Sequence, residues 1–239
     1  MDREVKLVKA KFHFKQGNRL KGDGKFEEAT QEYLKAIELN PDLAEAHNNL
    51  GILYKNNNRH QEAVDEYKRA LKINPELDQA YDNLGIIYLE MGDLVAAISI
   101  FKKALEINPE NPRAHNNLGL AYDKKGEGKL AEDEYKKAVQ INPEMQEAHY
   151  NLGIIYGTMG LYNESIEEFK KAIDLDPLDI YTHFNLALSY SKKEDIEKAI
   201  AEYQTALDLA PDFEEANHNL KLLIEKEALK DDYQRKGDY

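Results

Sequence analysis

Cysteine is absent from the 239-residue chain, which excludes disulfide bonds, thiolate metal ligands and a cysteine nucleophile. Long apolar runs are absent too: no stretch approaches the roughly 20 residues that span a bilayer, and residues 1–11 lack a signal-peptide core. Positive charge is scarce, with 32 Lys and Arg against 45 Asp and Glu. A chain this acidic repels the phosphates of nucleic acids and of membranes. We therefore expect a cytoplasmic protein with no nucleic acid partner and no membrane insertion.

Motifs of catalysis are missing as well. The chain contains no GxSxG elbow, no P-loop and no HExxH sequence. Acidic residues stand beside lysines, as Glu134 and Lys137 do, which is typical of solvated helix faces. We expect no enzymatic activity, no cofactor and no bound metal.

A fixed period dominates what is present. With 42% hydrophobic and 32% charged residues, the chain has the composition of a folded protein. Six of its seven prolines are spaced 34 residues apart, at Pro41, Pro75, Pro109, Pro143, Pro177 and Pro211. A period of this length indicates a solenoid of repeated helical units.

Other residue types keep the same period when each of these prolines is counted as repeat position 32. Position 7 is mostly Leu and position 11 mostly Tyr, whereas positions 20 and 27 carry small residues. Position 8 is small in every repeat: Gly17, Gly51, Gly85, Gly119, Gly153 and Ala187. Position 24 is always aromatic: Tyr33, Tyr67, Phe101, Tyr135, Phe169 and Tyr203. This pattern resembles the tetratricopeptide repeat family over nearly the whole chain.

The spacing also predicts the helices. Positions 4, 7, 8 and 11 form one face of a first helix, A, and positions 20, 24, 27 and 28 form one face of a second, B. Gly or Asn separates the two helices in most repeats, as a left-handed turn requires, but Glu194 fills that place in the sixth. Gly128 and Glu132 replace apolar residues in the fourth helix B, which predicts a weak helix there.

The fold class that follows is all-α: a right-handed superhelical solenoid of six repeats closed by a capping helix. Lys221 occupies the small position 8 of the last helix A, which fits a cap because no helix B follows it. The predicted segments are a lead-in (1–9), six repeats (10–43, 44–77, 78–111, 112–145, 146–179 and 180–213), the capping helix (214–230) and a solvated tail (231–239).

Histidine recurs at position 4, as His13, His47, His115, His149 and His183. A row of metal ligands is one interpretation. Successive A helices lie at least about 8–10 Å apart, however, and a zinc ligand must come within roughly 2.1 Å. We therefore expect position 4 to be a packing position.

Asparagine recurs at position 6 in every helix A after the first: Asn49, Asn83, Asn117, Asn151, Asn185 and Asn219. The resemblance implies that A helices line a concave groove with position 6 facing into it. Side-chain amides both donate and accept hydrogen bonds, so this row is a candidate clamp for a peptide backbone. The alternative is that Asn is simply common at this position of the family.

The two ends of the expected groove differ. Lys11 and Lys15, together with Lys21 and Lys55, make the amino-terminal end basic. Tyr150, Tyr181 and Phe184 make the other end aromatic, and we expect them to be exposed because positions 2 and 5 should point away from helix B. The carboxylate clamp of chaperone-binding repeats is not matched: Phe14, Gln79 and Asn83 stand where it needs cations.

We therefore expect a scaffold that binds an extended or helical segment of another protein in its groove. Two alternatives remain: self-association into a structural assembly, or service as the substrate-recruiting arm of a larger enzyme.

Overall fold

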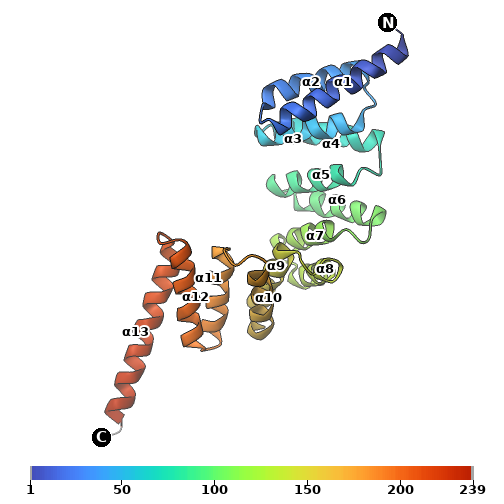
Figure 1. Ribbon diagram of the computed structural model, residues 1–239. Coiled ribbons are helices and arrows are strands. Elements are labelled where there is room, and N and C mark those ends of the chain that lie inside the picture. The colour runs from blue at the N-terminus through green and yellow to red at the C-terminus, as the bar shows by residue number, and fades with distance from the viewer. Residues whose placement is uncertain (1, 238–239) are drawn as a thin grey trace. The chain divides into compact units, whose positions relative to one another are not determined.

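The computed structural model describes residues 2–237, with side chains described for residues 2–228. This part of the chain contains thirteen α-helices and no strand, which confirms the predicted all-α repeat fold (Figure 1). Two compact units are formed, Met1–Lys125 and Gly126–Tyr239, and their boundary falls inside the predicted fourth repeat. No helix in residues 2–237 is both long and apolar enough to cross a membrane.

The first unit consists of three A–B hairpins followed by one more helix A. Helix α1 begins at Arg3, so most of the predicted lead-in is helical; no Gly or Pro interrupts residues 3–10. The helices are α1 (Arg3–Gly22), α2 (Phe26–Leu39), α3 (Ala44–Asn56), α4 (His60–Ile73), α5 (Asp78–Glu90), α6 (Leu94–Ile107) and α7 (Pro112–Lys124).

The second unit begins with a helix B and ends with the capping helix. Its helices are α8 (Gly128–Ile141), α9 (Gln146–Thr158), α10 (Tyr162–Leu175), α11 (Ile180–Lys192), α12 (Ile196–Leu209) and α13 (Glu214–Gly237). Helix α13 continues past residue 230, where the capping helix was expected to end. The predicted solvation of residues 231–239 lies outside the described side chains.

The repeated prolines end the B helices in the expected way. The residue before each proline has left the helical region: φ is −142° at Asn40 and −138° at Asp176. The side chains of these two residues accept hydrogen bonds from the backbone N–H groups of Asp42 and Leu178. These hairpins therefore stop at a short, internally hydrogen-bonded turn.

Left-handed residues join helix A to helix B, as predicted. Gly24, Gly92, Gly126 and Gly160 have positive φ, and so do Asn58 (57°) and Glu194 (62°). The left-handed conformation costs a side-chain-bearing residue such as Glu194 about 1–2 kcal/mol. The stacked hairpins hold Glu194 in this strained conformation.

Hairpins with glycine at position 8 close tightly because that position has no side chain. A Cβ atom on Gly51 would lie 2.6 Å from the Tyr67 ring, and one on Gly85 would lie 2.4 Å from the Phe101 ring. Both rings are fully buried. The aromatic residue of helix B therefore packs directly on the backbone of helix A, which explains the pairing of positions 8 and 24 in the sequence.

The expected weakness of the fourth helix B rests on a wrong premise. Gly128 is the first residue of α8 rather than an interior one, so the interior helix penalty does not apply. Glu132 is only 4% exposed, but its carboxylate accepts a hydrogen bond of 2.7 Å from Lys129. Gly128 is accommodated by its position at the start of the helix, and Glu132 by its pairing with a lysine.

Candidate functional site

Successive A helices contact one another within each unit: α3 with α5, α5 with α7, and α9 with α11. Side chains at positions 2, 5, 6, 9, 12 and 13 line the surface that these helices share. We call this surface the A face of each unit. Hydrogen bonds cross it from one helix A to the next, so it is a continuous surface within a unit.

The position-6 asparagines lie half-buried on the A faces, and three of them visibly link neighbouring repeats. The amide nitrogen of Asn49 donates to Asn18 (2.9 Å), and that of Asn83 donates to Asn48 (3.0 Å). The amide nitrogen of Asn185 donates to the Tyr150 hydroxyl (3.2 Å) and to the backbone carbonyl of Tyr181 (2.8 Å).

These contacts change what the asparagine row offers to a ligand. In the described side chains, no partner is found for the side-chain oxygens of Asn83 and Asn185. The amide nitrogen of Asn185 already donates two hydrogen bonds and that of Asn83 donates one, so each side chain keeps an acceptor oxygen and Asn83 keeps one N–H as well. Such acceptors suit the N–H groups of a peptide backbone. The remaining asparagines of the row, Asn117, Asn151 and Asn219, are half-buried at the same position.

The aromatic end of the predicted groove is less exposed than expected. Tyr181 is 62% exposed. Tyr150 and Phe184 are half-buried, because they pack on the helix B rings Phe169 (centroids 5.9 Å apart) and Tyr203 (5.8 Å). Position 5 precedes position 8 by about one helical turn, so a large ring there reaches helix B. The expectation that it points away from helix B is wrong.

Two of the four lysines at the basic end are engaged in contacts within the chain. The Lys21 amine donates to the Asn49 oxygen (3.3 Å), and burial lowers the pKa of this lysine. Lys55 pairs with Glu90 of the next helix A at 3.1 Å. Lys11 and Lys15 are exposed on α1 and are the cations of this end that stay in solvent.

A row of buried polar residues on the first unit's A face was not predicted. Position 5 holds Asn48 (2% exposed), Asp82 (8%) and Asn116 (0%), where repeats one, five and six have aromatic rings. One oxygen of Asp82 is buried without a hydrogen-bond partner. Burial raises the pKa of the Asp82 carboxyl, partly offset by Arg113 and reinforced by Asp78. The switch from aromatic to polar at position 5 was the sequence signal for this row.

We expect Asp82→Asn to raise the free energy of unfolding by about 1 kcal/mol at pH 7, because it removes a buried, partly unpaired charge. Between the ordinary carboxyl pKa near 4 and the raised folded value, the folded chain keeps a proton that the unfolded chain has lost. Stability of the parent protein therefore falls as pH rises through this window, and the advantage of the variant grows. Urea unfolding from pH 4 to pH 8 measures this.

The control for this prediction is Asp42→Asn, which changes an exposed carboxylate outside the A face and should alter stability by less than about 0.5 kcal/mol. A gain for Asp82→Asn that is equal at pH 4 and pH 8 would contradict the argument.

The position-4 histidines are held by oxygen atoms of the protein. His149 contacts Glu168 of its own repeat through Nδ1 (2.6 Å) and the carbonyl of Pro143 through Nε2 (2.9 Å). His47 and His183 make the same pair of contacts. In the described residues, no three His, Asp or Glu side chains are grouped as metal ligands. These histidines join the end of one repeat to the hairpin of the next.

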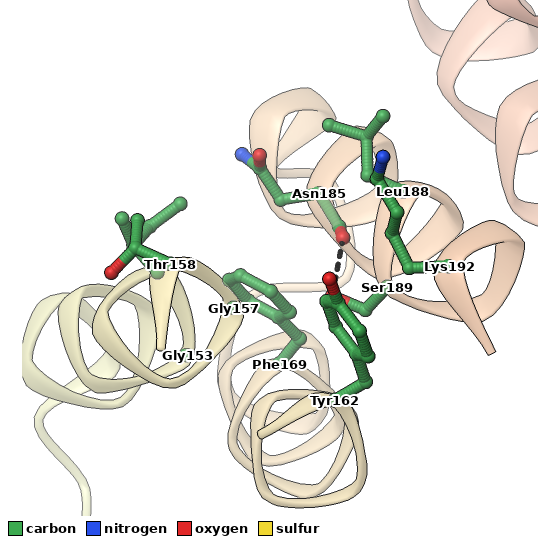
Figure 2. Close-up of a pocket in the computed structure, with 10 residues that line it drawn as sticks. Gly153, Gly157, Thr158, Tyr162, Phe169, Asn185, Leu188, Ser189 and Lys192 are labelled. Atoms are coloured by element: carbon green, nitrogen blue, oxygen red, sulfur yellow. Dashed lines mark hydrogen bonds between the residues drawn. The ribbon is translucent and has the colours of Figure 1, made fainter. Parts of the chain in front are cut away.

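The second unit's A face contains a pocket of about 300 Å³ between α9, α10 and α11. Gly153, Ile154, Gly157 and Thr158 line it from α9, and Leu188, Ser189 and Lys192 line it from α11. Figure 2 shows the Phe169 and Tyr162 side chains extending from α10 toward the space between these two helices, with Asn185 beside it. Thr158 and Lys192 are exposed, whereas Phe169 and Ser189 are buried, so the rim is polar and the floor is closed.

Stacked helix A–helix B hairpins with a shared A face define a helical repeat protein. A family model described as tetratricopeptide repeat matches residues 44–77, 112–145, 147–178 and 180–213. A second model, described as TPR repeat, matches residues 17–58 and 87–126, and a third matches residues 66–99. The chain belongs to the tetratricopeptide repeat family. Members of this family generally mediate protein–protein interactions.

Solved structures agree with this assignment. YrrB, described as a TPR protein with an unusual peptide-binding site, is 29% identical, with 79% of this chain and 97% of that chain covered and a TM-score of 0.64. MamA is 27% identical, with 67% of this chain and 94% of the MamA chain covered and a TM-score of 0.62. PilF of Pseudomonas aeruginosa, at 18% identity, covers 90% of this chain and 97% of its own with a TM-score of 0.78, a likeness of fold alone. No curated protein matches the sequence.

Proposed function

We propose that this protein is a non-catalytic scaffold whose A faces hold an extended or helical segment of a partner protein. The observation that carries the proposal is the position-6 asparagine row, in which Asn83 and Asn185 present side-chain oxygens without a partner in the described side chains. Leaving such acceptors on a shared surface favours a ligand that brings N–H donors. The likeness to YrrB, whose description names a peptide-binding site, supports the same function.

The residues that we assign to this binding surface are those expected from the sequence. Asparagine oxygens would accept from the partner backbone, the exposed Tyr181 would contact an apolar side chain, and Lys11 and Lys15 would favour acidic residues at one end. The half-buried rings of Tyr150 and Phe184 would support this surface from the side of the B helices, against which they pack.

Selection of peptides from a random library on the immobilised full chain tests the proposal. The affinity of enriched peptides is then measured by fluorescence polarisation. We expect Asn185→Ala to weaken binding about tenfold, the effect of losing one well-made hydrogen bond. Leu222→Asp, which changes a 51% exposed residue at position 9 of α13, should weaken apolar contacts as well.

The matched control is Glu167→Ala, on the exposed side of α10, which should leave the affinity unchanged. The proposal fails if no peptide is enriched, or if enriched peptides bind Asn185→Ala and Leu222→Asp as tightly as the parent.

Self-association is a second candidate, favoured by one observation. Helix α1 exposes Val8 (69%) and Phe12 (56%), along with Val5 and Leu7. Apolar side chains gathered on one terminal helix are a usual feature of subunit contacts. Light scattering across a concentration series tests this, since a monomer at all concentrations would contradict it and Val8→Lys should abolish any oligomer found.

A further inference from the structure

The pocket between α9, α10 and α11 exists because Gly157 has no side chain. Position 12 of the other repeats holds Lys21, Lys55, Leu89, Asp123 and Ser191. A Cβ atom on Gly157 would have a single neighbour within 4 Å, the Ser165 hydroxyl at 3.4 Å. A Cβ atom could therefore be added at Gly157 with one ordinary contact, unlike at Gly153, where it would lie 2.7 Å from the Phe169 ring.

The interior of the pocket suits an apolar group. Ile154, Phe169 and Leu188 supply its apolar walls. The two serine hydroxyls at this site are already engaged: Ser189 Oγ lies 3.0 Å from the Asn185 carbonyl and 2.9 Å from Ser165 Oγ, and Ser165 donates to the Gly153 carbonyl (2.8 Å). A polar group that entered beside them would lose its hydration and gain no donor from either serine.

The volume sets an upper limit on the size of the occupant. An apolar cavity of about 150 Å³ holds one benzene molecule. The pocket has about 300 Å³, which leaves room for any single aromatic or leucine side chain but not for a folded segment.

The rim adds a charge. Lys192 stands at the mouth in the last turn of α11, is exposed, and has no ion-pair partner in the described side chains. The Asn185 side-chain oxygen on the same rim has no partner among the described side chains and is free to accept a hydrogen bond. A ligand that fits the mouth therefore combines a backbone N–H with a carboxylate.

From these features we infer that the pocket receives one bulky apolar side chain of the partner, aromatic or leucine, with a carboxylate beside it that pairs with Lys192. The inference rests on the proposed function, since it names the anchor residue of the segment bound on the second unit's A face. Such an anchor fills a preformed hole, as the strongest contributors to protein interfaces commonly do.

Small probes test the pocket without a known partner. The probes are N-acetyl-L-phenylalanine, its carboxamide, and N-acetyl-L-alanine, titrated into the ¹⁵N-labelled full chain while the Gly153 and Gly157 amide signals are followed. We expect both phenylalanine probes to shift these signals, the carboxylate two- to fivefold more tightly than the amide, and the alanine probe to cause no shift. Equal response to alanine and phenylalanine would overturn the inference.

Two variants sharpen the result. Gly157→Leu should fill the space and weaken the phenylalanine probe at least tenfold, and Lys192→Gln should remove the difference between carboxylate and amide. Gly22→Leu adds the same side chain at the end of α1, where nothing lies within 4 Å, and should change neither probe. If the Gly157→Leu variant is folded and still binds the phenylalanine probe as tightly as the parent, the inference is overturned.

The peptides enriched on the parent chain separate this inference from the proposed function. Peptides weakened by both Asn185→Ala and Gly157→Leu support the anchor pocket. Peptides weakened by Asn185→Ala but unaffected by Gly157→Leu overturn the pocket and leave the A-face proposal standing. Peptides unaffected by Asn185→Ala, Leu222→Asp and Gly157→Leu overturn both.

Discussion

Replacing Phe101 with alanine is expected to lower the free energy of unfolding by about 3–5 kcal/mol, the largest single-residue effect that we predict for this chain. The Phe101 ring is fully buried and packs directly on the backbone of α5 at Gly85. Removing it loses the transfer free energy of the ring and leaves a cavity, because two helices joined by a tight turn at Gly92 cannot close over the gap.

Urea unfolding monitored by circular dichroism measures this change, and amide hydrogen exchange shows which helices lose protection. The matched control is Val95→Ala on the same helix α6, where a 71% exposed side chain should contribute less than about 0.5 kcal/mol. Tyr67→Phe is a second control: the Tyr67 hydroxyl is buried without a partner, so its removal should cost nothing. A loss below about 1 kcal/mol for Phe101→Ala would contradict this account of the core.

Replacing His47 with alanine is expected to cost about 2–3 kcal/mol. The ring contacts Glu66 through Nδ1 (2.5 Å) and the Pro41 carbonyl through Nε2 (2.9 Å), and both His47 and Glu66 are buried residues. An ionised carboxylate and a carbonyl only accept, so this geometry suits an imidazolium that donates from both nitrogens. Without it, Glu66 stays buried with Arg69 (2.6 Å) as its one remaining side-chain partner among the described residues.

The third repeat suggests how to test the pair as a unit. Where position 4 is Tyr81 instead of His, position 23 is Ile100 instead of Glu. We expect the double variant His47→Tyr, Glu66→Ile to lose at least about 1 kcal/mol less free energy of unfolding than the two single variants lose together. The reason is that the double change removes the buried charge and its partner at the same time. Gln61→Ala, on the exposed part of α4, is the control. Additive single and double changes in the unfolding midpoints would count against a coupled pair.

Sequence periodicity was enough to predict the helices, because the same few contacts recur in every repeat. Glycine at position 8 faces an aromatic ring at position 24, and a left-handed residue precedes each helix B, even where that residue is Glu194. The ends were less predictable. Residues 3–9 and 231–236 contain no Gly or Pro, so neighbouring helices extend into them beyond the repeat frame.

The candidate site was predicted by position but not by contact. The asparagine row lies on the A faces, yet its amide nitrogens are engaged with neighbouring repeats, because adjacent A helices lie within reach of a short side chain. Tyr150 and Phe184 were expected to be exposed, but rings of that length reach helix B from position 5. The unpredicted pocket had a signal, the glycine at position 12, but only the geometry shows that Gly157 lines a pocket and is not packed against a helix B ring as Gly153 is.

The contact between a position-4 histidine and the preceding proline carbonyl has a consequence for how such a chain can change in length. At His47, His149 and His183, the junction uses a proline, a histidine and a glutamate that recur with the 34-residue period. Duplicating or deleting one whole period by recombination between such units regenerates the same junction, so the chain can gain or lose a repeat without a new interface. The third repeat is the exception, because it has Tyr81 in place of the histidine and Ile100 in place of the glutamate. A junction of this kind is regenerated only if both residues are copied together.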